Sequence, residues 1–569
     1  MNSKNEIAIL DFGSQYTHLI ARRVRELGVV SHIYANDVPV SKLKNASGVI
    51  LSGGPRSLVR DKKLKIDKKI FDLGLPILGL CYGHQMLADI FGGKVASGQA
   101  REYGLANLKV QDAPIFAGVK KNSNVWMSHG DHVSKLPKGF VQIAGSNSES
   151  IAAMYNAQKK FYGFQFHPEV AHSKEGKKML HNFIFNICDT QKNWDTNLMM
   201  AAIENEIIKE AQDKNVFLLV SGGVDSAVCF ALLEKVLGKK RVFGLHIDSG
   251  TMRQNETKKI STALKKLGFD NLHIHNAQKE FLAALKNVSE PEQKRKIIGD
   301  LFLDITDRIM KEKNMSGSGW LLGQGTIYPD TIESGGTKNA DVIKTHHNRV
   351  PRVQQMIADG KIIEPLKELY KDEVRAIGLK LGLPKSMVQR HPFPGPGLAI
   401  RCLCSNGSKD LTTTIAPNLL KLPVKSVGVQ GDERSYSHPA LLIGSNPGWA
   451  KLRALSPTIT NKHKEVNRVL LPIFGDLKNI NKAKLNKAYL TKPRLELLRK
   501  IDAIVDEAIL ADKKCAKIWQ CPTVVIPFGY KNKESIVLRP VESEEAMTVS
   551  FAQIPDDTLK KIITKIKAL

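Results

Sequence analysis

Long apolar runs, paired cysteines and a signal segment are all missing from this sequence. No run approaches the length of a membrane span, so we do not expect a membrane protein. The seven cysteines are scattered and none is spaced as C-x-x-C, which argues against a disulfide framework and a zinc ribbon. No apolar signal segment stands behind residues 1–6. These features predict a protein of the reducing cytoplasm.

Acidic residues are also in short supply. The chain has 56 Asp and Glu against 84 Lys and Arg, which gives a net charge of +28. Such a charge makes nucleic acid the first partner to consider. The lysines are spread through helices, however, as in residues 61–65, and no motif interleaves basic with aromatic residues. Anionic nucleotide substrates explain the charge more simply, so we expect small-molecule partners and no nucleic acid.

What the chain does contain, near its centre, is a pattern that suits phosphate. An apolar run at 216–220 precedes a turn of small residues, and a helical run follows at 228–237. The turn reads Ser221-Gly222-Gly223-Val224-Asp225-Ser226-Ala227. Its glycines allow a close backbone approach, and the free N–H groups at a helix start point into the loop. The turn is therefore a cradle for phosphate oxygens; the plain alternative is a Gly-Gly turn with a helix-capping Ser or Asp.

Asp225 separates this turn from the Walker loop, which needs a Lys after its second glycine. A carboxylate beside a phosphate cradle is explained if a divalent cation lies between them, so we expect Mg²⁺ at Asp225. The string resembles the pyrophosphate loop of N-type ATP pyrophosphatases. That resemblance implies that residues 221–227 bind ATP, and that the enzyme adenylates a substrate oxygen and releases pyrophosphate.

The N-terminal part alternates apolar runs with helical segments. The runs lie at 6–11, 29–34, 48–51 and 75–80, which predicts a parallel, doubly wound α/β sheet. The fourth run leads into Gly79-Leu80-Cys81-Tyr82-Gly83. Small residues on both sides allow a strained turn that lifts Cys81 above the sheet, and the helix that follows favours a thiolate.

A nucleophilic thiol needs a base, and the base needs a group that orients it. A further apolar run at 161–166 leads into His167-Pro168-Glu169. His167 is the candidate base, and Glu169 is the candidate orienting group. Singly, the three residues have ordinary explanations as a buried Cys, a core His and a solvated Glu. Together, at the strand ends of one α/β domain, they indicate a catalytic triad.

Residues 6–190 resemble a class I glutamine amidotransferase. The resemblance implies that Cys81 attacks the side-chain amide of glutamine, that His167 transfers the proton and that ammonia leaves. It also implies an oxyanion hole formed by the N–H groups of Gly54 and Tyr82. The family segment 128–131 matches too, and we interpret His129 as a wall of the site, because His167 already fills the role of the base.

Three unusual strings lie beyond the phosphate loop. They are Ile297-Ile298-Gly299-Asp300, Lys344-Thr345-His346-His347-Asn348 and Arg390-His391-Pro392-Phe393-Pro394-Gly395-Pro396-Gly397-Leu398-Ala399. The last cannot be regular structure and predicts a fixed loop around a ligand. Adjacent histidines diverge, so the His-His pair does not indicate a metal site. Taken together, residues 6–400 resemble the glutamine-hydrolysing GMP synthases.

That family uses ATP to adenylate xanthosine monophosphate (XMP), and ammonia then displaces AMP to give GMP. The resemblance implies a lid that contains Asp300, Lys344, Thr345, His346 and His347. It implies a charged segment near the phosphates and the metal, with Lys367, Lys371, Asp372 and Glu373. It further implies an XMP loop with His391, Pro392, Phe393, Pro394, Gly395, Pro396 and Gly397.

The last third resembles the dimerisation region of that family, in two copies that begin at 422–432 and 521–528. The family's closing Lys-Pro-Pro…Trp-Glu tail, which helps to bind XMP, is missing, and the sequence has residues 565–569 at that point. We therefore expect another basic group to hold the XMP phosphate, and Arg539 is the best candidate. The alternative is that Arg539 is a solvated strand residue.

These patterns predict an amidotransferase over 1–192, an ATP pyrophosphatase over 193–400 and an α+β region over 401–569, in a monomer or a homodimer. Two other functions stay open. An NAD⁺ synthetase shares the pyrophosphate loop, but that family normally uses a Lys-Glu-Cys hydrolase domain and lacks the 391–399 string. A tRNA-modifying enzyme shares the loop and the basic charge, but the amidotransferase domain argues against it.

Overall fold

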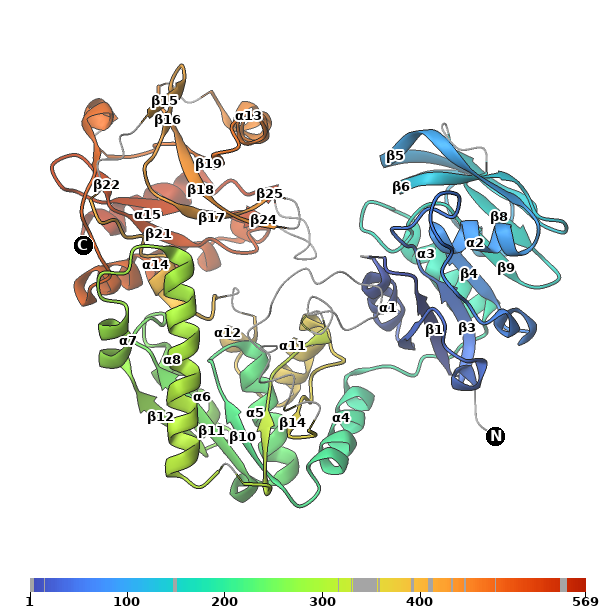
Figure 1. Cartoon of the computed structure of the whole chain (residues 1–569), viewed down its shortest axis with the longest axis horizontal. Coiled ribbons are helices and arrows are strands. Elements are labelled where there is room, and N and C mark those ends of the chain that lie inside the picture. The colour runs from blue at the N-terminus through green and yellow to red at the C-terminus, as the bar shows by residue number, and fades with distance from the viewer. Residues whose placement is uncertain are drawn as a thin grey trace. The chain divides into compact units, whose positions relative to one another are not determined.

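The computed structural model divides into two compact units, which are described separately (Figure 1). The first contains residues 1–203 and 328–346, and the second contains residues 204–327 and 347–569. The described residues are 5–14, 16–146, 151–315, 317–328, 330, 356, 359–389, 393–407, 413–430, 433–444, 447–475, 477–542 and 550–569. Within these ranges, no helix is both long and apolar enough to cross a membrane.

A nine-stranded sheet with the order β2-β1-β3-β4-β9-β8-β7-β5-β6 forms the first unit. Its parallel part consists of β2 (Val30–Ala35), β1 (Glu6–Asp11), β3 (Ala46–Leu51), β4 (Ile77–Leu80) and β9 (Phe161–Phe164). Its antiparallel part consists of β8 (Ala153–Asn156), β7 (Val141–Ser146), β5 (Lys94–Val110) and β6 (Asn122–Lys135). The parallel strands match the apolar runs, whereas the long antiparallel extension was not predicted.

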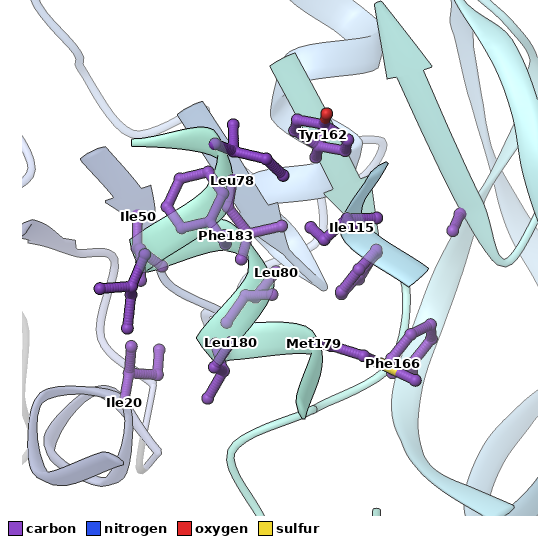
Figure 2. Close-up of a cluster of buried hydrophobic side chains, with 14 of the residues drawn as sticks. Ile20, Ile50, Leu78, Leu80, Ile115, Tyr162, Phe166, Met179, Leu180 and Phe183 are labelled. Atoms are coloured by element: carbon purple, nitrogen blue, oxygen red, sulfur yellow. The ribbon is translucent and has the colours of Figure 1, made fainter. Parts of the chain in front are cut away.

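Both faces of the parallel part are covered by helices. On one face, Leu78 and Leu80 of β4 share a buried cluster with Met179 and Leu180 of α3 (Gly176–His181) and with Phe183 (Figure 2). The helix α1 (Thr17–Glu26) belongs to the same face. The opposite face is covered by α2 (Tyr82–Ile90). Because helices bury both faces of the sheet, the strands have continuous apolar sequences. Polar functional residues are therefore expected at the carboxyl ends of the strands.

The second unit contains a parallel five-stranded sheet with the order β12-β11-β10-β13-β14. The strands are β12 (Leu272–Asn276), β11 (Val242–Asp248), β10 (Asn215–Leu219), β13 (Trp320–Gly323) and β14 (Ile362–Ile363). Among the described residues, the helices of this part are the second half of α4 (Thr196–Ala211), which begins in the first unit, and α5 (Val224–Leu237), α6 (Glu256–Lys266), α7 (Gln278–Ala284), α8 (Pro291–Glu312), α11 (Lys371–Lys380) and α12 (Lys385–Val388). The predicted class, two doubly wound sheets of parallel strands, is confirmed.

Two layers of helices also enclose this second sheet. Phe230 of α5 packs against Gly244 of β11, where an added Cβ would lie 2.5 Å from the Phe230 ring. On the other side, Phe281 of α7 and Ile305 of α8 share a buried cluster with Phe217 of β10. The strand ends that carry the phosphate loop therefore remain between the two helical layers.

The C-terminal part is α+β, as predicted. The region predicted as the first copy has an antiparallel pair, β17 (Ser426–Gln430) and β18 (Glu433–Leu442), then α13 (Trp449–Lys462) and β19 (Val466–Leu470). The region predicted as the second copy has the antiparallel pair β21 (Thr523–Ile526) and β23 (Ser535–Leu538), then α15 (Asp556–Lys567), and the internal repeat stays a prediction. The smaller strands are β15 (Thr413–Ala416), β16 (Leu419–Lys421), β20 (Lys484–Leu485), β22 (Phe528–Gly529), β24 (Val541–Glu542) and β25 (Ser550–Phe551).

One helix ties this part to the second sheet. The helix α14 (Lys492–Ala511) contributes Leu495 and Leu498 to the cluster that contains Phe217 of β10. Leu398 and Cys402, which follow the proline–glycine string, join the same cluster. The segment after residue 400 is thus packed into one core with the sheet, and the expected boundary at 400 stays a prediction.

Candidate active sites

Cys81 lies in a strained turn between β4 and α2. Its φ is 49° and its ψ is −101°, a conformation that residues other than glycine rarely adopt. An added Cβ on Gly79 would lie 2.5 Å from the carbonyl carbon of Gly83, and one on Gly83 would lie 2.5 Å from the carbonyl oxygen of Leu51. Glycines are therefore required on both sides of the turn, and the elbow predicted from them is present.

His167 and Glu169 form a buried pair beside this turn. His167 Nδ1 is 2.7 Å from Glu169 Oε1, and the His167 side chain also hydrogen-bonds with that of Cys81. Burial lowers the pKa of His167, but Glu169 and Cys81 outweigh this effect and raise the pKa to about 10. The imidazole therefore carries a second proton at neutral pH. The structure brings the three predicted residues together in the order thiol, imidazole, carboxylate.

Two glutamines near the thiol were missed by the sequence analysis. Gln165 Nε2 lies 3.8 Å from Cys81 Sγ. Gln85 donates to Gln165 Oε1 at 3.2 Å and to the carbonyl oxygen of Asp131 at 2.6 Å. A signal was available, because Gln85 lies in the first turn of the helix after the elbow and Gln165 comes two residues before His167. The pair forms a polar surface next to the nucleophile.

The segment 128–131 of β6 borders the same thiol. The carbonyl oxygen of Ser128 is 3.5 Å from Cys81 Sγ. His129 is buried, and its Nδ1 lies 3.1 Å from the carbonyl oxygen of Asp131. This placement fits the interpretation of His129 as a wall, which stays a prediction.

The backbone N–H groups of Gly54 and Tyr82 are available near the elbow. Neither donates a hydrogen bond to any residue in the described ranges. An added Cβ on Gly54 would lie 3.4 Å from Tyr82 Cγ, and one on Gly53 would lie 3.2 Å from His167 Cε1. The glycine pair thus lets the backbone approach the triad closely, with two donors unused.

The phosphate loop connects β10 to α5 in the second unit. Gly222 has a φ of 84°, which favours glycine, and an added Cβ there would lie 2.6 Å from Ile260 Cδ1. Ser221 Oγ and Ser226 Oγ are 3.1 Å apart. Both hydroxyl groups and the first N–H groups of α5 therefore surround one turn.

The start of α5 differs from the prediction. The helix begins at Val224, after Gly223 as its N-cap, rather than at Val228. Asp225 and Ser226 are consequently in the first helical turn, where the unpaired N–H groups favour acidic and short polar side chains. The loop proper is shorter than the motif suggests, because the motif continues into the helix.

Asp225 is the acidic centre of this loop. One carboxylate oxygen forms an ion pair with Lys371 Nζ of α11. The other oxygen, Oδ1, is buried and has no hydrogen-bond partner among the described residues. A buried carboxylate oxygen without a partner fits a Mg²⁺ ligand. Among the described residues, no three or more Asp, Glu, His or Cys side chains form a cluster that could hold a metal ion. The remaining Mg²⁺ ligands would therefore come from water and substrate phosphate.

The other predicted residues of the charged segment have separate roles. Lys367 Nζ is 2.9 Å from Glu206 and 2.8 Å from Glu210 of α4, which raise its pKa against the effect of burial. Glu373 caps the start of α11 by accepting from the N–H of Tyr370. Asp372 is in the first turn of α11. Asp300 is exposed on α8, and Lys344, Thr345, His346 and His347 lie outside the described residues.

The proline–glycine string packs closely against the loop after β11. Gly397 has a φ of 65°, and an added Cβ would lie 2.3 Å from the carbonyl oxygen of Thr251. The N–H of Leu398 donates to that same oxygen at 2.7 Å. The structure describes the string from Phe393 onward, including Pro394, Gly395 and Pro396, whereas His391 and Pro392 lie outside the described residues.

The Phe393 ring of this string lies next to two guanidinium groups. Its ring centroid is 4.5 Å from the guanidinium carbon of Arg253 and 5.0 Å from that of Arg401. Arg401 Nη1 is 3.1 Å from Asp502 of α14. Arg539 lies close enough to Arg401 that the two charges interact, and burial together with Arg401 lowers the pKa of Arg539 to about 10.

A fourth guanidinium belongs to the same group. Burial and the charge of Arg539 lower the pKa of Arg468, on β19, to about 9. Arg539 is only partly exposed, so the alternative of a solvated strand residue is not what the structure has. We call Arg253, Arg401, Arg468 and Arg539 the arginine cluster.

Comparison with known proteins gives matches for both units. Residues 8–187 match the family "Glutamine amidotransferase class-I", and residues 196–300 match the family "NAD synthase". A Leptospira interrogans protein named "Probable GMP synthase [glutamine-hydrolyzing]" is 44% identical over 99% of this chain and 95% of its own length. The "GMP synthase [glutamine-hydrolyzing]" of Aquifex aeolicus is 42% identical over 83% of this chain and 98% of its own length. The corresponding protein of Neisseria meningitidis is 41% identical with the same shares.

The "NAD synthase" match covers the phosphate-loop region alone, whereas the named relatives cover most or all of the chain. The triad, the phosphate loop and the proline–glycine string therefore occur here in the combination that the resemblance implied. The chain belongs to the glutamine-hydrolysing GMP synthase family.

Proposed function

We propose that this chain synthesises GMP: it hydrolyses glutamine to glutamate and ammonia, and it uses ATP to adenylate XMP, which ammonia then converts to GMP. Membership of the family and the presence of both domain types carry this function. The best single structural support is the buried Cys81–His167–Glu169 triad, in a chain that also holds a pyrophosphate loop.

In the first site, the thiolate of Cys81 attacks the amide carbon of glutamine. The protonated His167 donates its proton to the leaving ammonia, and Glu169 keeps the imidazole in the required orientation. The unused N–H groups of Gly54 and Tyr82 stabilise the negative oxygen of the tetrahedral intermediate. His167 then removes a proton from water, which cleaves the thioester and releases glutamate.

In the second site, residues 221–227 hold the phosphates of ATP by their N–H and hydroxyl groups. Asp225 Oδ1 would hold Mg²⁺, which would neutralise charge on the leaving pyrophosphate. The ammonium of Lys371 forms an ion pair with the Asp225 carboxylate. When nucleotide binds, the same ammonium reaches a phosphate oxygen instead, because a cation moves easily between two neighbouring anions.

The arginine cluster holds the XMP phosphate. Arg401 has a carboxylate partner in Asp502, but Arg539 has none in the described ranges, and it faces other guanidinium groups. Several like charges in a partly buried place are costly unless an anion compensates them. A phosphate dianion next to Phe393, in the string that the resemblance assigns to XMP, meets this requirement.

We also propose the parts and the setting of this activity. An amidotransferase part spans 1–192, a synthetase part spans 193–400 and a C-terminal part spans 401–569, in a monomer or a homodimer. All seven cysteines are free, which fits a reducing cytoplasm.

The test is an assay with ATP, Mg²⁺, XMP and glutamine. We expect GMP, AMP, pyrophosphate and glutamate in equal amounts. A second reaction replaces XMP by deamido-NAD⁺, the substrate of an NAD⁺ synthetase. Formation of NAD⁺ without GMP would overturn the proposed function in favour of that enzyme, and salt-dependent retention of tRNA without GMP formation would favour a tRNA-modifying enzyme.

A further inference from the structure

Lys294 of α8 carries its ammonium into the core of the second unit. The residue is 1% exposed. Its Nζ lies 2.9 Å from the carbonyl oxygen of Cys402, 3.4 Å from that of Ala399 and 2.8 Å from Cys404 Sγ. No carboxylate of the described residues forms an ion pair with it. A buried cation needs an anion, and the sulfur of Cys404 is the group placed to supply one.

A second cation faces the same sulfur. Arg494 of α14 has Nη1 3.8 Å from Cys404 Sγ and Nη2 2.9 Å from the carbonyl oxygen of Leu403. Arg494 also forms an ion pair with Glu534 at 2.7 Å and donates to the carbonyl oxygen of Tyr489 at 2.8 Å. A hydrogen bond with the Cys402 thiol, and the charges of Lys294 and Arg494, lower the pKa of Cys404 to about 5 against the effect of burial.

The other cysteines of this unit differ. Burial raises the pKa of Cys229, Cys515 and Cys521. For Cys402, the hydrogen bond with Cys404 and burial act in the same upward direction. The thiolate is the nucleophilic and oxidisable form of cysteine. Lys294 and Arg494 stabilise this form at Cys404, whereas the other cysteines of this unit favour the neutral thiol.

We propose that Cys404 is a resting thiolate and a site of oxidation by hydrogen peroxide. The sulfur attacks one peroxide oxygen, so that an S–O bond forms and the O–O bond breaks. The hydroxide that leaves takes a proton and becomes water. Sulfur is oxidised by two electrons to a sulfenic acid, and the peroxide is reduced by the same two electrons. The small size of hydrogen peroxide suits a sulfur in a residue that is 7% exposed.

The oxidation affects the substrate loop of the second site. Lys294 and Arg494 fasten residues 399–404 through three carbonyl oxygens and one sulfur. A neutral sulfenic acid removes the anion between two buried cations and adds an oxygen atom to a packed core. The segment must then rearrange, and it includes Arg401 of the arginine cluster. GMP synthesis is therefore lost upon oxidation, a consequence that rests on the proposed function.

The chemical part is tested on the full chain without any variant. After brief exposure to hydrogen peroxide and removal of the oxidant by catalase, free thiols are blocked in denaturant. The reversibly oxidised thiols are then reduced and labelled with a heavy reagent. Trypsin, which cleaves after Arg401 and Lys409, releases residues 402–409 as one peptide, and the fragments of that peptide distinguish Cys402 from Cys404. We expect labelling of Cys404 at least tenfold faster than of Cys515 or Cys521. Equal labelling of the three would overturn the proposal, whatever the protein catalyses.

The consequence is tested with ammonium chloride as the nitrogen source in a Cys81→Ala background, so that oxidation of Cys81 cannot contribute. Peroxide should inactivate this protein, and dithiothreitol should restore it. Addition of Cys404→Ser should slow inactivation at least tenfold, whereas the matched substitution Cys515→Ser should not. If Cys404 is labelled but inactivation is unchanged by Cys404→Ser, the link to the substrate loop is wrong. If no GMP forms before peroxide is added, the proposed function fails instead.

Discussion

Asp225 has one carboxylate oxygen paired with Lys371 and the other buried without a partner in the described part of the chain. Such an arrangement contributes little to folding, because an unpaired buried oxygen is unfavourable. The arrangement fits a carboxylate that binds a ligand such as Mg²⁺. Single side chains such as this one can therefore be tested for a role in binding or catalysis separately from a role in folding.

The first prediction concerns Asp225→Asn. The substitution removes the charge that would hold Mg²⁺, so pyrophosphate release from ATP and XMP should fall by about a hundredfold, the scale of losing one charge contact to a transition state. Glutamine hydrolysis without XMP should keep its basal rate. The control is Asp270→Asn, which removes a surface ion pair with Lys239. Unchanged pyrophosphate release would contradict the assignment of Asp225.

The second concerns the pH dependence of the His167–Glu169 pair. The folded pKa of His167, about 10, is raised above the usual 6.5. The pair therefore stabilises the folded state fully below about pH 6.5, and this stabilisation disappears as the pH rises through 10. Glu169→Gln should lower the free energy of unfolding by about 3 kcal/mol at pH 6, and by much less at pH 10.5.

Chemical denaturation of the parent and of Glu169→Gln at both pH values measures this difference. Glu26→Gln is the control, because Glu26 forms surface ion pairs with Arg22 and Arg23, and such pairs contribute about 0–1 kcal/mol. An equal loss at both pH values in Glu169→Gln would mean that His167 is not charged in the folded protein.

The third concerns Arg539 and XMP. Arg539→Ala should raise the KM for XMP by about tenfold or more, with little change for ATP or glutamine, because a guanidinium–phosphate contact contributes about 1.5–3 kcal/mol. Arg539→Lys should restore only part of the affinity, since an ammonium cannot form a bidentate contact. Arg453→Ala, at an exposed arginine of the same part, is the control. An unchanged KM would place the phosphate elsewhere.

At the scale of elements, the loops are held by backbone fit as much as by side chains. The proline–glycine string approaches the loop after β11 so closely that Leu398 donates to the Thr251 carbonyl oxygen. From the other side, Arg499 of α14 donates to the carbonyl oxygens of Gly250 at 2.5 Å and Met252 at 3.0 Å. A helix of the C-terminal part thus fixes the loop that carries Arg253.

Gly397→Ala tests this fit. The new Cβ would meet the Thr251 carbonyl oxygen at 2.3 Å, at a φ of 65°, so the string must move. We expect a fall in melting temperature of several degrees and a loss of XMP-dependent pyrophosphate release. Gly395→Ala is the matched control for the melting temperature, because a Cβ there meets nothing within 4 Å. If both variants melt alike, the close approach is not a constraint.

At the scale of the whole molecule, the chain joins two chemistries that need to share only ammonia. The thiol of Cys81 lies in the first unit, and the phosphate loop lies in the second. Cys81→Ala should therefore abolish GMP formation from glutamine and leave synthesis from ammonium salts within about twofold of the parent. Synthesis of GMP is measured with each nitrogen source separately. Equal loss with both sources would contradict two independent sites.

The net charge of +28 also belongs to this scale. The arginine cluster and the phosphate loop account for only a few of the 84 basic residues. Many others form surface ion pairs, such as Lys63 with Asp89 and Arg308 with Glu280.

The sequence by itself determined the parallel strands, the elbow and the phosphate loop. These depend on local patterns: an apolar run covered on both faces forms a strand, and glycines permit a strained turn. The predicted start of the helix after the phosphate loop was wrong, because the motif at 221–227 belongs partly to the loop and partly to the helix, which already begins at Val224. It missed the long β5–β6 extension, because those strands are half polar and their burial depends on neighbours.

Only the tertiary structure decided which charges meet. Lys371 reaches Asp225 across 146 positions, and Lys294 reaches Cys404 across 110 positions. The arginine cluster likewise combines residues from four separate segments. No local pattern encodes these contacts, because they depend on how far a side chain extends and on how much water the surrounding core excludes. The residue types indicated the chemistry, and the packing of distant elements set the surroundings of Cys404 and of Arg539.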